Sequence, residues 1–164
     1  MRFRTNLSLR ESPLVDSRFV LLAHLGATWF MTGLIWFVQI VHYPLMRMVG
    51  HEGFVEYSRR HQASTSLVVG PLMLIEVVTA ALLLDQDAQL RVSWLFWASC
   101  GLLVVVWLAT ALWQMPLHQQ LLSGYDEGRI RALVRSNWIR TFAWTGRALI
   151  VTYLVFLRMQ CAPE

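Results

Sequence analysis

The sequence contains no lysine, because all 14 of its basic residues are arginine. This absence excludes a catalytic Schiff-base lysine and the lysine of a phosphate-binding P-loop. Cysteine is also scarce: Cys100 and Cys161 are the only two, and they form neither a disulfide framework nor a CxxC metal or redox motif. We therefore expect both thiols to be chemically inert.

Several catalytic motifs are missing as well. His51-Glu52 lacks the second histidine of an HExxH zinc site, and no Glu-x-x-His of a di-iron bundle occurs. The sequence also has no GxSxG and no GxGxxG. These absences argue against metalloproteases, ferritin-like oxidases, serine hydrolases and dinucleotide-binding folds.

Charge is scarce too. Only 15% of the 164 residues are charged and 56% are hydrophobic, whereas about a quarter of the residues in a soluble domain are charged. The formal net charge of +4 comes from scattered arginines, without a nucleic-acid-binding motif. We therefore expect no nucleic-acid partner, and anionic lipid headgroups are the favoured partner of these arginines.

The abundant feature is apolar sequence. Four runs are each close to the 17 to 25 residues, roughly, that a helix needs to cross a bilayer, and we place the spans at about 19–42, 66–84, 92–115 and 139–158. They predict an all-α, integral membrane four-helix up-down bundle that forms a single domain over residues 1–164. We expect a multi-pass protein of a bacterial-type cytoplasmic membrane. Arginines are balanced between the two sides, so the sidedness stays open.

Local signals refine this plan. Pro44 is expected to end or kink the first helix around His42 and Tyr43, and Pro71 to kink the second. Residues 51–63 have the pattern of an interfacial amphipathic helix. Gly124-Tyr125-Asp126 predicts a turn, followed by a helix from Glu127 to Val134.

The fourth span carries an arginine deep in the apolar run. Arg147 costs about 2.5 to 3.5 kcal/mol near the membrane centre, which cancels the contribution of its apolar neighbours. Counted at about 1.5 Å per residue from the shared membrane face, Glu76 and Arg147 lie at similar depth. We expect Glu76 to pair with Arg147 or with Arg140, either as a structural clasp or as a functional acid or base.

The first helix carries a polar stripe. Its members fall on one helix face, which must point into the bundle: His24, Thr28, Thr32, Gln39 and His42. We interpret His24 as a hydrogen-bonded packing residue because no second histidine shares its level.

An up-down bundle brings three histidines, His42, His61 and His118, to one membrane face from three different helices. One hypothesis is a site in which all three imidazoles bind a transition metal, or two of them bind haem iron, with Glu76 as a further ligand or base. The alternative is three separate interfacial histidines at helix ends.

The fourth helix presents a second set of polar residues on one face. Asn137, Arg140, Trp144 and Arg147 follow the spacing i, i+3, i+7 and i+10. With Gln114 from the third helix, they offer hydrogen bonds, a forked cation and a stacking surface to a substrate.

The four-span plan, His42-Tyr43-Pro44 at the end of helix 1, and Asn137 to Arg140 with Trp144 in helix 4 resemble the anthrone-oxygenase-like family of small four-helix membrane proteins. The resemblance covers most of the chain. It implies oxygenation of a polycyclic phenol or a similar aromatic molecule at the membrane, with histidines as acid or base groups.

The leading hypothesis is a membrane-embedded oxidoreductase or oxygenase acting on an aromatic or quinone-like substrate. Its catalytic residues would be His42, His61, Glu76 and His118. The sequence does not identify a cofactor; a transition metal or haem is the option that the histidines suggest. The alternative is a non-catalytic membrane subunit or small transporter, in which the polar stripe packs helices or lines a solute path. Such a protein would form a homo-oligomer or bind a membrane partner.

Overall fold

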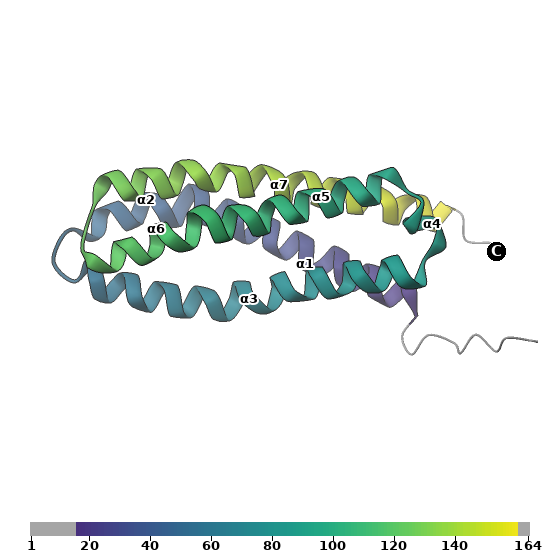
Figure 1. Cartoon of the computed structure of the whole chain (residues 1–164), viewed down its shortest axis with the longest axis horizontal. Coiled ribbons are helices and arrows are strands. Elements are labelled where there is room, and N and C mark those ends of the chain that lie inside the picture. Colours follow the sequence, from purple (N-terminus) through teal and green to yellow (C-terminus); the bar gives the residue numbers. More distant parts are fainter. Residues whose placement is uncertain (1–15, 161–164) are drawn as a thin grey trace, which may run out of the picture.

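The computed structural model describes residues 16–160 of the chain. The arginines at positions 2, 4 and 10 and the second cysteine lie outside these residues. Within them the chain forms four long helical segments and no strand (Figure 1). Each segment is long and apolar enough to cross a membrane: Ser17–Val49, Phe54–Gln86, Trp94–Ser123 and Glu127–Gln160. The all-α four-helix bundle is therefore confirmed.

Two of the four segments are composites of different helix types. The elements in chain order are α1 (Ser17–Phe37), the π-helical turn η1 (Val38–His42), α2 (Tyr43–Met46), the 3₁₀ turn η2 (Arg47–Val49), α3 (Phe54–Gln86), α4 (Ala88–Arg91), α5 (Trp94–Ala109), the π-helical turn η3 (Thr110–Gln114), α6 (Met115–Gln120), the 3₁₀ turn η4 (Leu121–Ser123) and α7 (Glu127–Gln160).

The first helix does not end at His42 and Tyr43 as the sequence analysis expected. It continues past Pro44 because the π turn η1 precedes the proline, and the N–H of Tyr43 bonds the carbonyl five residues back, at Val38. The wider turn accommodates the proline, whose ring would clash with the carbonyl four residues back in a regular helix. In the third segment the π turn η3 precedes Pro116 in the same way.

The second and fourth segments are also longer than expected. Residues 54–63 are the first turns of α3 rather than a separate interfacial helix, and the α-helix continues through Pro71 to Gln86. The predicted helix start at Glu127 is correct, but α7 runs on to Gln160 without a break.

The two halves of the chain repeat one local pattern. Each has an α-helix, a π turn, a proline-containing helical turn, a 3₁₀ turn and then a long α-helix. Gly53 and Gly124, both at positive φ, lie just before the long helices. An ion pair in the first turns follows each glycine, Glu56 with Arg60 and Glu127 with Arg131. The chain is therefore built as two similar helical hairpins.

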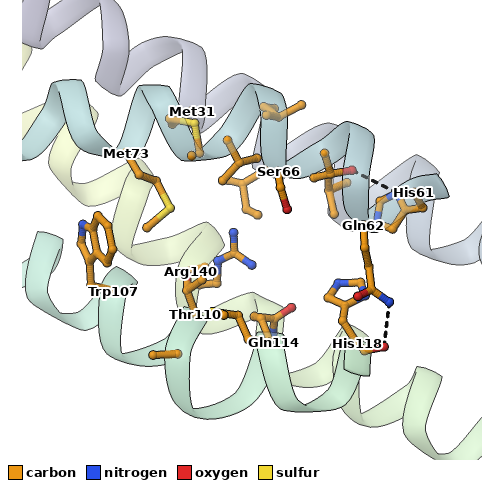
Figure 2. A pocket seen from close by; sticks show the side chains of 18 of the residues that line it. Met31, His61, Gln62, Ser66, Met73, Trp107, Thr110, Gln114, His118 and Arg140 are labelled. Carbon is orange, nitrogen blue, oxygen red and sulfur yellow. Dashed lines mark hydrogen bonds between the residues drawn. The ribbon is translucent and has the colours of Figure 1, made fainter. Parts of the chain in front are cut away.

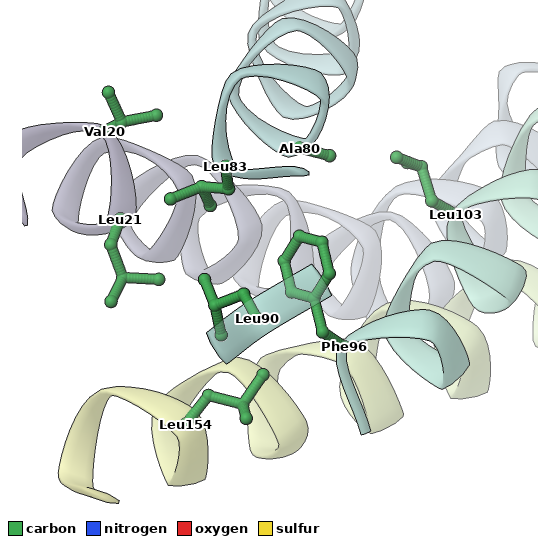
Figure 3. Packing of buried hydrophobic residues seen from close by; sticks show 8 residues of the cluster. All are labelled: Val20, Leu21, Ala80, Leu83, Leu90, Phe96, Leu103 and Leu154. Atoms are coloured by element: carbon green, nitrogen blue, oxygen red, sulfur yellow. The ribbon is translucent and has the colours of Figure 1, made fainter. Parts of the chain in front are cut away.

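The hairpins are joined along one side only. Helix α1 packs on α3 and α7, and α5 packs on α7, whereas α3 and α5 form no comparable interface. The end near α4 is closed by an apolar cluster from all four segments (Figure 3): Val20, Leu21, Ala80, Leu83, Leu90, Phe96, Leu103 and Leu154. At the opposite end η4 contacts α3.

Candidate functional site

A pocket of about 500 Å³ lies in the opening between α3 and α5–α6, backed by α1 and α7 (Figure 2). We call it the α3–α5 pocket. Exposed residues of both helices belong to its lining, including Ser66 from α3 and Trp107 and Ala111 from α5 and η3. These side chains lie on bundle surfaces that also carry exposed large apolar residues, so the pocket opens on an apolar face of the bundle.

The α3–α5 pocket has two chemically different halves. In one half the lining is apolar and includes Met31, Ile35, Val69, Met73 and Trp107. In the other half it is polar and includes Tyr43, His61, Gln62, Gln114 and His118. Arg140 projects into the space between them (Figure 2).

The histidines of the polar half lie close together. The rings of His42 and His61 stack with centroids 4.2 Å apart and planes 22° apart, and the ring of His118 lies 5.4 Å from that of His61. His61 lines the pocket with a hydrogen bond between Nδ1 and Thr65 Oγ1, whereas His42 lies behind it, 3.4 Å from the Tyr57 hydroxyl.

The arrangement of these rings does not fit the hypothesis of a metal centre. The lone pair of an imidazole nitrogen lies in the ring plane, so stacked rings direct their lone pairs side by side rather than at a common point. Among residues 16–160, no group of three His, Cys, Asp or Glu side chains is arranged to hold a metal ion. The geometry therefore does not fit His42, His61 and His118 as one ligand set, and the stacked rings of His42 and His61 cannot lie on opposite sides of a haem iron.

Arg140 is the most unusual residue of the pocket. Only 7% of its surface is exposed, it forms no ion pair within the described part of the chain, and its buried Nε has no hydrogen-bond partner there. Its guanidinium lies 5.2 Å from the centroid of the Trp144 ring. A buried cation without an anion is costly, and a cation–π contact offsets that cost only in part.

Gln114 and Tyr43 are polar lining residues in the same part of the pocket as Arg140. The Tyr43 hydroxyl donates to Gln114 Oε1 at 2.9 Å, and Gln114 Nε2 donates to Ser136 Oγ at 2.8 Å. Gln114 is the last residue of a π turn, and such turns frequently occur at functional sites. Tyr43 is the first residue after the other π turn and contributes to this site from α2.

A second polar region, which we call the sealed network, lies outside the pocket lining. Glu76 is fully buried and forms the expected ion pair with Arg147, which is also fully buried. The Glu76 carboxylate also accepts a hydrogen bond from Thr28 at 3.1 Å and one from the Trp144 indole at 3.0 Å. Thr28, Trp144 and Arg147 thus all donate to the Glu76 carboxylate.

Two further residues of the polar stripe on helix 1, His24 and Gln39, also form hydrogen bonds inside the bundle. The ring of His24 bonds Thr79 at 2.7 Å and lies 3.5 Å from the Arg147 guanidinium, which confirms it as a hydrogen-bonded packing residue. Gln39 accepts a hydrogen bond from Asn137 at 2.7 Å. The stripe therefore faces the bundle interior as expected.

The sequence-predicted site residues divide into three groups. His61, Gln114, His118 and Arg140 line the pocket. His42, Asn137 and Trp144 are outside the lining: His42 stacks on His61, Asn137 bonds Gln39, and Trp144 lies against Arg140. Glu76 and Arg147 belong to the sealed network, to which Trp144 also donates. Sequence reasoning missed Tyr43, Gln62 and Thr65. A signal for Tyr43 was present, because it adjoins the proline that the sequence analysis singled out.

Comparisons with known proteins add nothing to this geometry: no family model, no curated protein and no solved structure matches the chain.

Proposed function

We propose that the protein is a membrane-embedded oxidoreductase of the oxygenase type, which takes an aromatic substrate from the bilayer into the α3–α5 pocket. The observation that carries the proposal is the pocket itself: it opens on an apolar face of the bundle and is apolar in one half and polar in the other, with histidines and an unpaired arginine. Its volume of about 500 Å³ lies within the range of roughly 300 to 1,000 Å³ typical of small-molecule sites.

The polar half supplies acid–base groups. His118 Nδ1 is buried without a hydrogen-bond partner among residues 16–160, and His61 lies beside it in the lining. In the proposed reaction these two neighbouring imidazoles act together to take a proton from a phenol or an activated carbon, so both are required. The Arg140 guanidinium then stabilises the resulting oxyanion, and Gln114, bonded to Tyr43 and Ser136, forms the polar wall beside it.

The resemblance to anthrone oxygenases supplies the reaction class. Dioxygen is the oxidant: a methylene carbon between two aromatic rings loses two hydrogens and gains one oxygen atom as a carbonyl, and the second oxygen atom leaves as water. The histidines remove the first proton from the substrate, and the apolar half of the pocket holds its rings. The proposed site uses no metal or haem ligand from this chain.

The test is oxygen consumption by purified protein in detergent micelles with anthrone as substrate. We expect anthraquinone formation that falls by about 100-fold or more in His118→Ala or His61→Ala, the range of general acid–base catalysis. His51→Ala is the matched control, because His51 is exposed and lies outside the pocket lining. Turnover that is unchanged in both pocket variants would contradict the proposed roles.

A non-catalytic subunit or transporter is the second candidate function. It is favoured by the sealed network, which packs α1, α3 and α7 together and whose ion pair, Glu76 with Arg147, lies outside the pocket lining. In this case wild-type protein shows no oxygen uptake with any phenolic substrate and purifies as an oligomer or with a partner. For both candidates we place the protein in a bacterial-type cytoplasmic membrane.

A further inference from the structure

The charge of the pocket points to a narrower class of ligand. The only arginine among the lining residues is Arg140, and no aspartate or glutamate occurs among them. The other titratable side chains that face the space are His61, His118 and Tyr43, and none of these carries a fixed negative charge. The lining therefore offers a buried cation and neutral hydrogen-bonding groups to whatever enters.

The second arginine of the bundle interior shows what an ion-paired guanidinium looks like in this fold, although its Nε, like that of Arg140, has no hydrogen-bond partner among residues 16–160. Arg147 bonds the Glu76 carboxylate and approaches His24, whereas Arg140 lies two helical turns away on α7 and has no anionic partner in the described chain. A guanidinium binds the two oxygens of a carboxylate with two parallel hydrogen bonds, and it also donates to the single oxygen of a phenolate, so an anion from outside the chain matches Arg140.

The positions of the polar and apolar halves of the pocket indicate the shape of that anion. The histidine half lies toward the η4 end of the bundle, and the half with Met31, Met73 and Trp107 lies deeper in the spans (Figure 2). A molecule with its acidic group at Arg140 and its apolar body in the deeper half lies parallel to the surrounding lipids. It enters sideways between α3 and α5 without reversing its orientation.

We propose that the ligand of the α3–α5 pocket is an amphiphilic organic acid, with its carboxylate or phenolate oxygens on Arg140 and its apolar body against Met31, Met73 and Trp107. This inference rests on the proposed function for the site and adds a ligand class: an anion rather than a neutral quinone. Arg140 is the residue that sets this preference.

The experiment compares two probes with the same ring system, 9-anthracenecarboxylate and 9-anthracenemethanol. Binding to the protein in micelles is measured as energy transfer from tryptophan to the probe. The part of the signal that excess laurate abolishes is taken as binding in the pocket. We expect wild-type protein to bind the carboxylate at least about tenfold more tightly than the alcohol, as a charge-assisted hydrogen bond predicts.

Variants assign the preference to Arg140. Arg140→Gln is expected to remove it by weakening carboxylate binding at least about tenfold, while alcohol binding changes less than about twofold. Arg140→Lys keeps the charge and retains a smaller preference, so it serves as the test if the glutamine variant does not fold. Arg135→Gln, on an exposed position of the same helix, is the matched control and retains wild-type binding.

Equal binding of the two probes by wild-type protein would overturn the inference, and so would a preference that survives Arg140→Gln. If anthrone oxidation persists in either case, the ligand class is wrong while the proposed function stands. If neither probe binds to wild-type protein and no oxygen is consumed, both proposals are overturned.

Discussion

Arg140 and Arg147 lie on the same face of α7 and are both buried, yet their surroundings differ completely. Arg147 faces Glu76, which also binds Thr28 and Trp144, so this charge is neutralised inside the bundle. Arg140 faces an open pocket and has no anion from residues 16–160. The comparison indicates that Arg147 stabilises the fold, whereas Arg140 stays free to bind a ligand and lowers the stability of the ligand-free protein.

The arrangement of the helices explains the contrast. Helices α1, α3 and α7 meet around the sealed network, whereas the missing interface between α3 and α5 exposes Arg140 to the pocket. Trp144 lies between the two regions: its ring lies beneath the Arg140 guanidinium, and its N–H bonds Glu76.

The largest expected effect comes from breaking the ion pair. Glu76→Ala leaves the Arg147 charge buried without a partner, so we expect a loss of about 3 to 5 kcal/mol in the free energy of unfolding. Denaturant unfolding in micelles, followed by circular dichroism, measures it. The double variant Glu76→Leu with Arg147→Met should recover much of this loss because no unpaired charge remains. A double variant as unstable as the single one would contradict this interpretation.

A smaller loss is expected when one donor to Glu76 is removed. Trp144→Phe keeps an aromatic ring beneath Arg140 but removes the indole N–H, so unfolding should become easier by about 1.5 to 3 kcal/mol. Trp138→Phe is the control, because Trp138 packs on Trp36 and Phe142 outside the network. If both variants lose the same stability, the hydrogen bond to Glu76 contributes nothing specific.

Filling the opening should affect binding far more than stability. Ala111 is exposed and lines the pocket, so Ala111→Trp narrows the entry between α3 and α5. We expect binding of 9-anthracenecarboxylate to weaken by about tenfold, with little change in unfolding. Leu112→Trp, next in sequence but outside the lining, is the control and should bind normally. Normal binding by the Ala111 variant would place the entry elsewhere.

The smallest effect is expected at the surface. Glu56 pairs with Arg59 and Arg60 on the exposed first turns of α3, where solvent screens the charges. Glu56→Gln should therefore leave the unfolding transition of the purified protein unchanged. A clear destabilisation there would mean that ion pairs in this protein contribute regardless of burial, which removes the basis of the comparison.

Much of the fold followed from the sequence, because long apolar runs and a buried charge leave few alternatives. The four long apolar helices, the polar stripe on helix 1 and the pairing of Glu76 with Arg147 are confirmed. The continuation of the first helix past Pro44 was not predicted, since a π turn has no simple sequence signal.

The candidate site was only partly predictable. Up-down topology correctly brought His61, Gln114, His118 and Arg140 to one end of the bundle. Nothing in the sequence indicates that α3 and α5 lack an interface, because that depends on how the two hairpins pack. For the same reason Glu76 was expected near the histidines, whereas it lies in the sealed network.

The most direct test of the comparison is the unfolding free energy of ligand-free wild type, Arg140→Met and Arg147→Met, measured side by side in the same detergent. The account predicts that Arg147→Met is destabilised by about 3 to 5 kcal/mol, because Glu76 is left unpaired, and that Arg140→Met is as stable as wild type or more stable. Equal destabilisation of the two variants would contradict it, since Arg140 would then be held by the fold as firmly as Arg147.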